Sequence, residues 1–232
     1  MSTIVERLAR VRMRIAQAAT AAGRDPASIR LLAVSKTRPT ADVEAALAAG
    51  QTAFGESYLQ DALPKIAVLG ERAEWHFIGP IQSNKTRQIA SHFAWVHSVD
   101  RLKIAQRLNE QRPAGLPPLN VCLQVNTSGE NTKAGISPAT TLTLATAVAA
   151  LPRLRLRGLM TIPAPEQDVQ QQRQPFALLR QLLEQLNAKG FELDTLSMGM
   201  SNDLEAAILE GATLVRIGTA IFGPRAKNID RE

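Results

Sequence analysis

The sequence predicts a single-domain α/β protein with a closed (β/α)8 barrel, also called a TIM barrel. Eight short apolar runs rich in β-branched residues alternate with seven helical stretches, about 25 residues apart, which is typical of parallel βαβ units. The chain has 232 residues, which fits the roughly 250 that such a barrel occupies. An open doubly wound sheet is the alternative. No G-x-G-x-x-G motif follows the first expected strand, which disfavours the dinucleotide-binding form of that sheet. We therefore expect one domain over residues 1–232.

The first expected element is a leading helix within residues 1–23, packed on the barrel. Thr3 and Glu6 have the spacing of a capping box, and the apolar residues that follow recur at intervals of four and three. These apolar residues are Ile4, Leu8, Val11, Ile15 and Ala18. Gly23 and then Pro26 end the helix.

Eight strands are expected after the leading helix. They cover residues 30–35, 52–55, 74–78, 95–99, 119–125, 154–160, 192–196 and 214–217. Two of the intervening helices carry clear start and stop signals. One begins after Pro39 and stops at Gly50, and the other begins near Asp203 and stops at Gly211.

Strands six and seven carry charged residues with period two. Arg153, Arg155 and Arg157 alternate with leucines in strand six, and Glu192 and Asp194 flank Leu193 in strand seven. Period-two spacing places the charges of each strand on one face. We expect ion pairs between these strands at the bottom of the barrel, with solvated strand starts as the alternative.

Composition excludes several classes of protein. Apolar residues make up 45% and charged residues 21% of the chain, as in a folded domain rather than a disordered one. No apolar run reaches the roughly 18 residues of a membrane span, and the N-terminus lacks the apolar core of a secretion signal. A single cysteine, Cys122, excludes an internal disulfide and suits a reducing compartment. We expect a cytoplasmic protein without a membrane partner.

The net charge of +6 could serve an anionic ligand or a nucleic acid. The basic residues are scattered, and aromatic residues make up only 4% of the chain, so bases would find few stacking partners. We expect no nucleic-acid partner. A nucleic-acid-binding protein remains a third class of function, and it predicts binding that weakens steeply with salt.

Lys36 is the most informative single residue. It ends the apolar run LLAVSK, so its amine leaves the tip of the first strand, and active groups of these barrels sit at the carboxyl ends of strands. Burial disfavours the charged form of a lysine, and a neutral amine is the form that makes an imine with a carbonyl. The alternative is a lysine that extends into solvent.

The segments SMGMSND and RIGTAIFG, at the ends of the last two strands, form the second feature. Gly199 and Gly218 permit a close approach of the backbone to a ligand, and Ser201 and Thr219 add hydroxyl donors. A phosphate site after strands seven and eight is common in this barrel. Arg216 points inward if Ile217 points outward, so it is either a ligand partner or half of a buried ion pair.

The first and last strands are neighbours in a closed barrel. Lys36 and the expected phosphate site are then adjacent, which fits a phosphorylated aldehyde held as an imine. The alternative for the glycines is a role in turns and helix caps alone.

The chain closely resembles the family of pyridoxal phosphate homeostasis proteins, which are related to the barrel domain of alanine racemase. The resemblance rests on LLAVSK (31–36), FGESYLQD (54–61), EWHFIGPIQSNK (74–85), HSVDR (97–101), RGLMTIPAP (157–165), LSMGMSNDLEAAI (196–208) and VRIGTAIFG (215–223). It implies an alanine racemase N-terminal-like barrel with pyridoxal 5′-phosphate (PLP) joined to Lys36 as an aldimine. It further implies phosphate contacts from Ser201, Gly218 and Thr219, and contact of Arg216 with the pyridine ring.

Three further residues complete the expected site. Ser57 stands where the family usually has Asn, and a serine is shorter and carries one donor instead of two. His76 is a candidate cofactor contact, with a core histidine as the alternative. Lys133 is a candidate second cation near the pocket, with an exposed loop lysine as the alternative. His92 and His97 share no metal-ligand spacing with His76, so we expect no metal.

The function implied by the resemblance is to hold or deliver PLP and to keep vitamin B6 and amino-acid pools balanced, as a monomer without established turnover. PLP-dependent apoenzymes are candidate transient partners. The alternative is an enzyme with weak racemase or transaminase activity on a small amino acid. A racemase needs a second acid/base, and the only tyrosine, Tyr58, follows the second strand. Because Arg216 can only donate, it would leave the ring nitrogen unprotonated and damp carbanion formation.

Overall fold

Eight parallel strands close into a barrel in strictly sequential order, β1-β2-β3-β4-β5-β6-β7-β8, in the computed structural model of this chain. The structure describes residues 2–130 and 134–224. The strands are β1 (Arg30–Val34), β2 (Ala53–Glu56), β3 (Glu74–Phe77), β4 (Trp95–Val99), β5 (Leu119–Gln124), β6 (Leu154–Met160), β7 (Thr195–Ser197) and β8 (Leu214–Ile217). The first and last strands pair from Arg30↔Leu214 to Ala33↔Ile217 and close the ring. The predicted barrel is confirmed.

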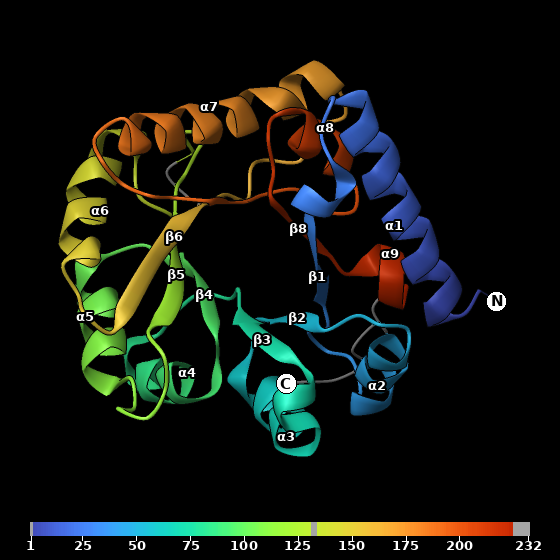
Figure 1. The fold of residues 1–232 in the computed structure, drawn as a ribbon, viewed down its shortest axis with the longest axis horizontal. Coiled ribbons are helices and arrows are strands. Elements are labelled where there is room, and N and C mark those ends of the chain that lie inside the picture. Colours follow the sequence, from blue (N-terminus) through green and yellow to red (C-terminus); the bar gives the residue numbers. More distant parts are fainter. Residues whose placement is uncertain (1, 131–133, 225–232) are drawn as a thin grey trace.

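Helices surround the strands, as Figure 1 shows. They are α1 (Ile4–Ala21), α2 (Thr40–Ala48), α3 (Leu59–Leu69), α4 (Thr86–His92), α5 (Leu102–Gln111), α6 (Thr141–Ala149), α7 (Val169–Asn187), α8 (Leu204–Leu209) and α9 (Thr219–Phe222). None of the helices within residues 2–130 and 134–224 is long and apolar enough to cross a membrane.

The leading helix α1 forms as its pattern predicts. The Thr3 hydroxyl accepts from the backbone of Glu6 at 3.2 Å, and the Glu6 carboxylate accepts from the backbone of Thr3 at 2.9 Å. Leu8, Val11 and Ile15 are buried, and the helix packs against α2, α8 and α9. It therefore lies over the junction where the barrel closes.

Apolar side chains pack in two places, between the strands and the helices and inside the barrel. The large core between strands and helices holds most of the buried aliphatic and aromatic residues. Two smaller apolar clusters lie apart from it, Leu32 with Ala53 and Leu214, and Trp95 with Cys122 and Met160. Much of the remaining barrel interior is polar, and this polar interior supports the site described below.

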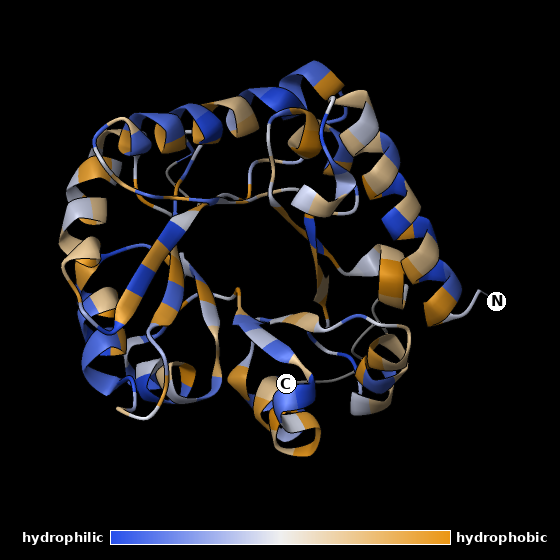
Figure 2. Ribbon diagram, in the orientation of Figure 1, coloured by the Kyte–Doolittle hydropathy of each residue, from blue (hydrophilic) through white to orange (hydrophobic). Residues whose placement is uncertain are grey.

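The expected pairing of charges between strands six and seven is confirmed at one position. Arg157 Nη2 lies 2.5 Å from Asp194 Oδ2, and the Arg157 guanidinium lies 4.8 Å from the centre of the Trp95 ring. Arg155 and Glu192 are exposed instead, as solvated strand starts would be. Figure 2 shows the alternation of hydrophilic and hydrophobic residues along β6.

Strand seven is shorter than expected and begins later. The prediction of 192–196 was wrong at its start, since β7 covers Thr195–Ser197. The backbone N–H and C=O of Leu193 are both hydrogen-bonded at 2.9 Å by the Asn187 side chain at the end of α7. A side chain therefore takes the backbone groups that a neighbouring strand would otherwise use.

Candidate functional site

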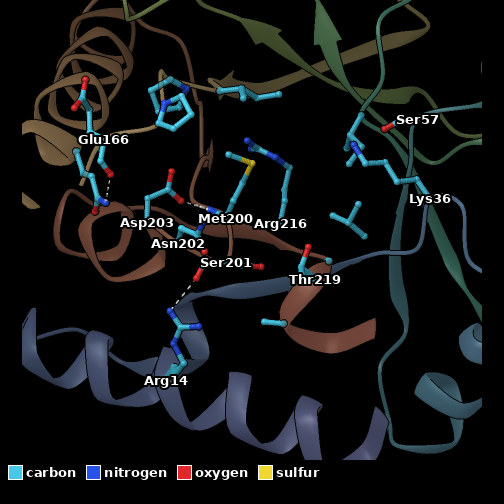
Figure 3. Close-up of a pocket in the computed structure, with 18 of the residues that line it drawn as sticks. Arg14, Lys36, Ser57, Glu166, Met200, Ser201, Asn202, Asp203, Arg216 and Thr219 are labelled. Carbon is cyan, nitrogen blue, oxygen red and sulfur yellow. Dashed lines mark hydrogen bonds between the residues drawn. The ribbon is translucent and has the colours of Figure 1, made fainter. Parts of the chain in front are cut away.

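A cavity of about 770 Å³ opens at the carboxyl ends of the strands. Its walls come from the residues that follow β1, β2, β3, β6, β7 and β8, together with Val34 on β1, Arg216 on β8 and one residue of α1. Figure 3 shows Lys36 on one side of this pocket, Arg216 in the middle, and Ser201 and Asp203 on the other side. The pocket thus brings together side chains from both ends of the sequence.

Lys36 lines the pocket directly after β1, and its side chain is half-buried. The next residue, Thr37, has φ +63°, the only positive φ of a non-glycine residue in the described part of the chain. A β-branched residue in the left-handed region is strained, and such strain is concentrated at functional sites. The strained residue immediately follows Lys36, in the turn beyond the end of β1 at Val34.

A buried ion pair holds the backbone just before Lys36. Lys65 Nζ lies 2.7 Å from Glu56 Oε1 and donates to the Ser35 carbonyl at 2.8 Å, while Ser35 Oγ donates to Glu56 Oε1 at 2.6 Å. Burial raises the pKa of Glu56, and the neighbouring Lys65 opposes that rise. Because these groups are almost fully buried, they fix the end of β1 from which Lys36 extends.

Arg216 lies on β8 and reaches the pocket from inside the barrel. It is 4% exposed, donates from Nη1 to Ser197 Oγ at 2.8 Å, and donates from Nη2 to the Thr161 carbonyl at 2.8 Å. Among the described residues these bonds use two of its five N–H groups, so three remain for a ligand. Burial lowers the pKa of Arg216 to about 10, which leaves it charged at neutral pH, and the nearby Asp203 opposes the shift.

Ser201 and Thr219 supply hydroxyl groups at the opposite wall, after β7 and β8. Within the described residues neither hydroxyl makes a hydrogen bond to the protein, so both are available to a bound anion. Gly218 stands between β8 and α9, where an added Cβ would lie 3.2 Å from the Val34 carbonyl oxygen. The three predicted phosphate contacts therefore come from the segments after β7 and β8, and Gly218 lies against Val34 at the end of β1.

Arg14 holds the loop that carries Ser201, and sequence reasoning missed it. Its Nη2 donates to the Ser201 carbonyl at 3.1 Å, while Nε and Nη2 pair with the two carboxylate oxygens of Glu205 at 2.9 and 3.0 Å. The dashed line from Arg14 in Figure 3 marks the first of these bonds. Nothing local to residue 14 signals this role, because it depends on how α1 docks on α8.

The other expected site residues are divided between the pocket and its surroundings. Ser57 lines the pocket. His76 lies outside the set of pocket-lining residues and is fully buried inside the barrel, so its placement supports the core-histidine alternative instead of a direct contact. Tyr58 also lies outside that set and is 52% exposed. Lys133 lies outside the described residues.

His76 is held by hydrogen bonds at both of its ring nitrogens. Its Nε2 lies 2.6 Å from Glu74 Oε1, and its Nδ1 lies 2.9 Å from Nε2 of His97. In the described part of the chain no group of three or more His, Cys, Asp or Glu side chains is arranged to hold a metal ion. Burial lowers the pKa of His76 to about 4, although hydrogen bonding and charge attraction from Glu74 oppose the shift. The two histidines therefore serve the barrel interior as neutral rings.

The depressed pKa of His76 predicts a loss of stability in mild acid. An unfolded chain protonates this ring near pH 6.5 and the folded chain near pH 4, so the unfolded state binds more protons between these values. The contribution of the neutral His76 ring to the unfolding free energy is fully present above pH 6.5. It is lost as the pH falls toward 4, a total of about 3 kcal/mol. Urea unfolding at pH 7, 5.5 and 4.5 measures this loss of unfolding free energy. His76→Gln should make the loss of stability in this window smaller, although the buried His97, whose pKa is also lowered, still contributes to it. His92→Gln, on the surface, should leave the profile unchanged, and a flat wild-type profile contradicts the prediction.

Comparisons with known proteins agree with the barrel fold of this chain. The family model described as alanine racemase, N-terminal domain, matches residues 7–226. A protein of Pseudomonas aeruginosa named pyridoxal phosphate homeostasis protein is 66% identical over 226 residues, covering 97% of each chain. One of the same name from Escherichia coli (strain K12) is 55% identical over 232 residues, covering 97% of this chain and 98% of that protein.

Solved structures with the same barrel fold are also found. PipY of Synechococcus elongatus PCC7942, described as having PLP bound, superposes with a TM-score of 0.83 at 36% identity, covering 95% of this chain and all of that one, 100%. Alanine racemase from Corynebacterium glutamicum gives a TM-score of 0.71 at 17% identity, covering 95% of this chain and 62% of that one. The second likeness concerns the fold alone.

Proposed function

This chain belongs to the family of pyridoxal phosphate homeostasis proteins, built on the alanine racemase N-terminal domain, and from that premise we propose that it binds PLP and takes part in PLP homeostasis. The observation that carries the proposal is a single pocket that joins Lys36, Arg216, Ser201 and Thr219. An amine, a fixed cation and two hydroxyl donors match the aldehyde, the pyridine nitrogen and the phosphate of this cofactor. PLP supplies a reactive aldehyde and an electron-withdrawing ring when it is bound.

The residues present fit this ligand in their hydrogen-bonding capacity. Arg216 has three N–H groups that the described protein does not use, and it remains charged while fully enclosed. The Ser201 and Thr219 hydroxyls are equally unused within the described residues. Ser57 replaces the asparagine usual in the family and still lines the pocket, so it supplies one donor at that position.

We assign the covalent attachment to Lys36. Its Nζ attacks the aldehyde carbon, a C=N bond forms, and the aldehyde oxygen leaves with two protons as water. Borohydride reduction followed by peptide mapping tests the ligand and the attachment point together. We expect the reduced adduct within residues 31–65, the tryptic peptide that contains Lys36, because trypsin cleaves neither at the modified lysine nor between Arg38 and Pro39. An adduct on another lysine, or no adduct, contradicts the assignment.

Ser201→Ala should weaken PLP retention by about 1–3 kcal/mol, because a hydrogen bond to a charged phosphate is lost. Equilibrium dialysis against PLP measures the change. Ser91→Ala is the matched control, since the Ser91 hydroxyl donates to the Arg87 carbonyl in α4, outside the pocket. Equal retention by Ser201→Ala and the wild type would place the phosphate elsewhere.

A PLP carrier and a PLP-dependent enzyme are expected to differ in how fast they exchange the Cα proton of amino acids. A racemase needs an acid/base group on each face of the cofactor, and the half-exposed Tyr58 lies outside the pocket-lining set. Slow or absent proton–deuterium exchange at Cα over a panel of amino acids supports the carrier, and fast exchange supports a racemase or transaminase.

The same proposal includes a monomer in the cytoplasm that passes PLP to PLP-dependent apoenzymes. The single cysteine suits a reducing compartment, and burial raises the pKa of the Cys122 thiol to about 12, which leaves it unreactive. Light scattering after gel filtration measures the mass of the PLP-loaded protein, and a dimer mass would contradict this part. Transfer is tested by following the activity of an added apoenzyme.

A further inference from the structure

A row of hydrogen-bonded side chains crosses the inside of the barrel away from the pocket. We call it the internal network, and its members, in order from the pocket, are Arg216, Ser197, His97, His76 and Glu74. The successive distances are 2.8, 2.8, 2.9 and 2.6 Å. These residues come from β8, β7, β4 and β3, so the network joins strands on different sides of the ring.

The two ends of the internal network have fixed hydrogen-bonding roles. Arg216 can only donate, because a charged guanidinium has no acceptor. Glu74 can only accept. Burial alone would raise its pKa, but hydrogen bonds from His76 and from Arg30, 3.0 Å away, lower the pKa of Glu74 to about 2. At neutral pH the network therefore runs from a permanent donor to a permanent acceptor.

These ends determine where the protons between them lie. Ser197 accepts from Arg216 and donates to His97 Nδ1, His97 donates from Nε2 to His76 Nδ1, and His76 donates from Nε2 to Glu74. With the opposite tautomers, the lone pair of His76 Nε2 would face the Glu74 carboxylate at 2.6 Å, which is repulsive. Charged rings are disfavoured too, because burial lowers the pKa of His97 well below its ordinary value, as it does that of His76.

Arg216 carries a buried charge that no direct carboxylate partner neutralises. Among the described residues it forms no ion pair, although it is only 4% exposed, and Asp203 acts on it through charge alone, without a hydrogen bond. A buried charge of this kind needs hydrogen-bond acceptors and an opposite charge within reach. The internal network supplies an acceptor at Ser197 and an anion at its far end, and aligned hydrogen bonds polarise one another.

We propose that Ser197, His97 and His76, with both histidines as Nε2–H tautomers, are positioning residues that link the charge of Glu74 to Arg216 and hold its guanidinium toward the pocket. The effect of the internal network on a bound pyridine ring rests on the proposed binding of PLP. The histidine tautomers do not depend on that binding. Without Ser197, Arg216 keeps one hydrogen bond to the part of the chain that the structure describes, at the Thr161 carbonyl, and can rotate about it. His97 then loses its donor at Nδ1.

The tautomers are measured first, in the ligand-free wild-type protein. The chain has three histidines, so long-range ¹H–¹⁵N correlation spectra are simple, and His92→Gln identifies the surface ring. We expect His76 and His97 to be Nε2–H tautomers, and neutral at pH 6. An Nδ1–H tautomer or a charged ring at either position overturns the proposal, whether or not the protein binds PLP.

Variants then test the link to Arg216. Ser197→Ala should raise the dissociation constant for PLP about threefold to tenfold and shift the absorption spectrum of the bound cofactor. Ser197→Thr, which restores the hydroxyl, should recover both. Glu74→Gln keeps an acceptor for His76 but removes the charge, so it should shift the spectrum in the same direction.

Ser98→Ala is the matched control. Ser98 is a buried serine on β4 that donates to the Gly79 carbonyl and lies outside the internal network. We expect its PLP affinity and spectrum to match the wild type. Wild-type affinity and spectrum in Ser197→Ala would overturn the link to Arg216. Failure of the wild type itself to bind PLP would instead contradict the proposed function.

Discussion

Lys36→Ala should lose covalently held PLP completely and keep the barrel fold. Purified wild-type protein should be yellow, and this variant should be colourless after gel filtration, because no other pocket-lining residue among those described carries a primary amine. The fold should persist because Lys36 follows the last strand residue, Val34, and is only half-buried. Absorption spectra, borohydride mapping and a thermal melt followed by circular dichroism give the three readouts.

Two further variants distinguish the loss of the covalent bond to PLP from the loss of the positive charge at residue 36. Lys36→Arg retains a cation at the strand end but cannot form the imine, so it should also be colourless. Lys103→Ala removes an exposed lysine on α5 and should remain yellow. A coloured Lys36→Ala protein with an unchanged spectrum would show that another lysine holds the cofactor.

Arg216→Glu should change both the reactivity of the bound cofactor and the stability of the protein. A carboxylate beside the pyridine nitrogen favours its protonation, and a protonated ring withdraws electrons more strongly. We therefore expect an altered absorption spectrum and faster Cα proton exchange on added amino acids. We also expect a loss of about 3–5 kcal/mol in unfolding free energy, because Ser197 and the Thr161 carbonyl lose a charged donor inside the barrel.

A neutral variant distinguishes the loss of unfolding free energy from the effect on the pyridine ring. Arg216→Gln loses the charge without adding a carboxylate, so it should be destabilised but should not accelerate exchange as Arg216→Glu does. The measurements are urea unfolding of the ligand-free proteins and deuterium incorporation by the loaded ones. Unaltered spectrum and exchange in Arg216→Glu would place Arg216 away from the ring nitrogen.

The residues at strand ends and the inward-pointing Arg216 were predictable from the sequence, but the hydrogen-bond partners inside the barrel were not. Lys36, Ser201 and Thr219 stand directly after apolar runs, and the closed order of strands brings them into one pocket. His97 and Ser197 also lie within apolar runs, but their partners come from strands that are distant in the chain. Period-two spacing shows which residues share a face, but not which strands face each other across the interior.

Arg14 and the start of strand seven were missed for a related reason. The role of Arg14 depends on the docking of α1 against α8, which its own neighbours in the sequence do not encode. The start of β7 is moved by Asn187, a side chain that satisfies the backbone of Leu193. Tertiary hydrogen bonds decided both cases, whereas local patterns were sufficient for the capping box at Thr3.

The pairing of β1 with β8 has a consequence for biosynthesis. Lys36 leaves the ribosome well before Ser201, Arg216 and Thr219, which lie more than 160 residues further along the chain. A nascent polypeptide therefore carries the proposed attachment lysine long before it possesses the proposed phosphate and ring contacts, and the ring of strands cannot close until β8 has emerged. From the proposed site we expect stable loading with PLP only in molecules whose barrel has closed, and no loading of translation products that end before β8.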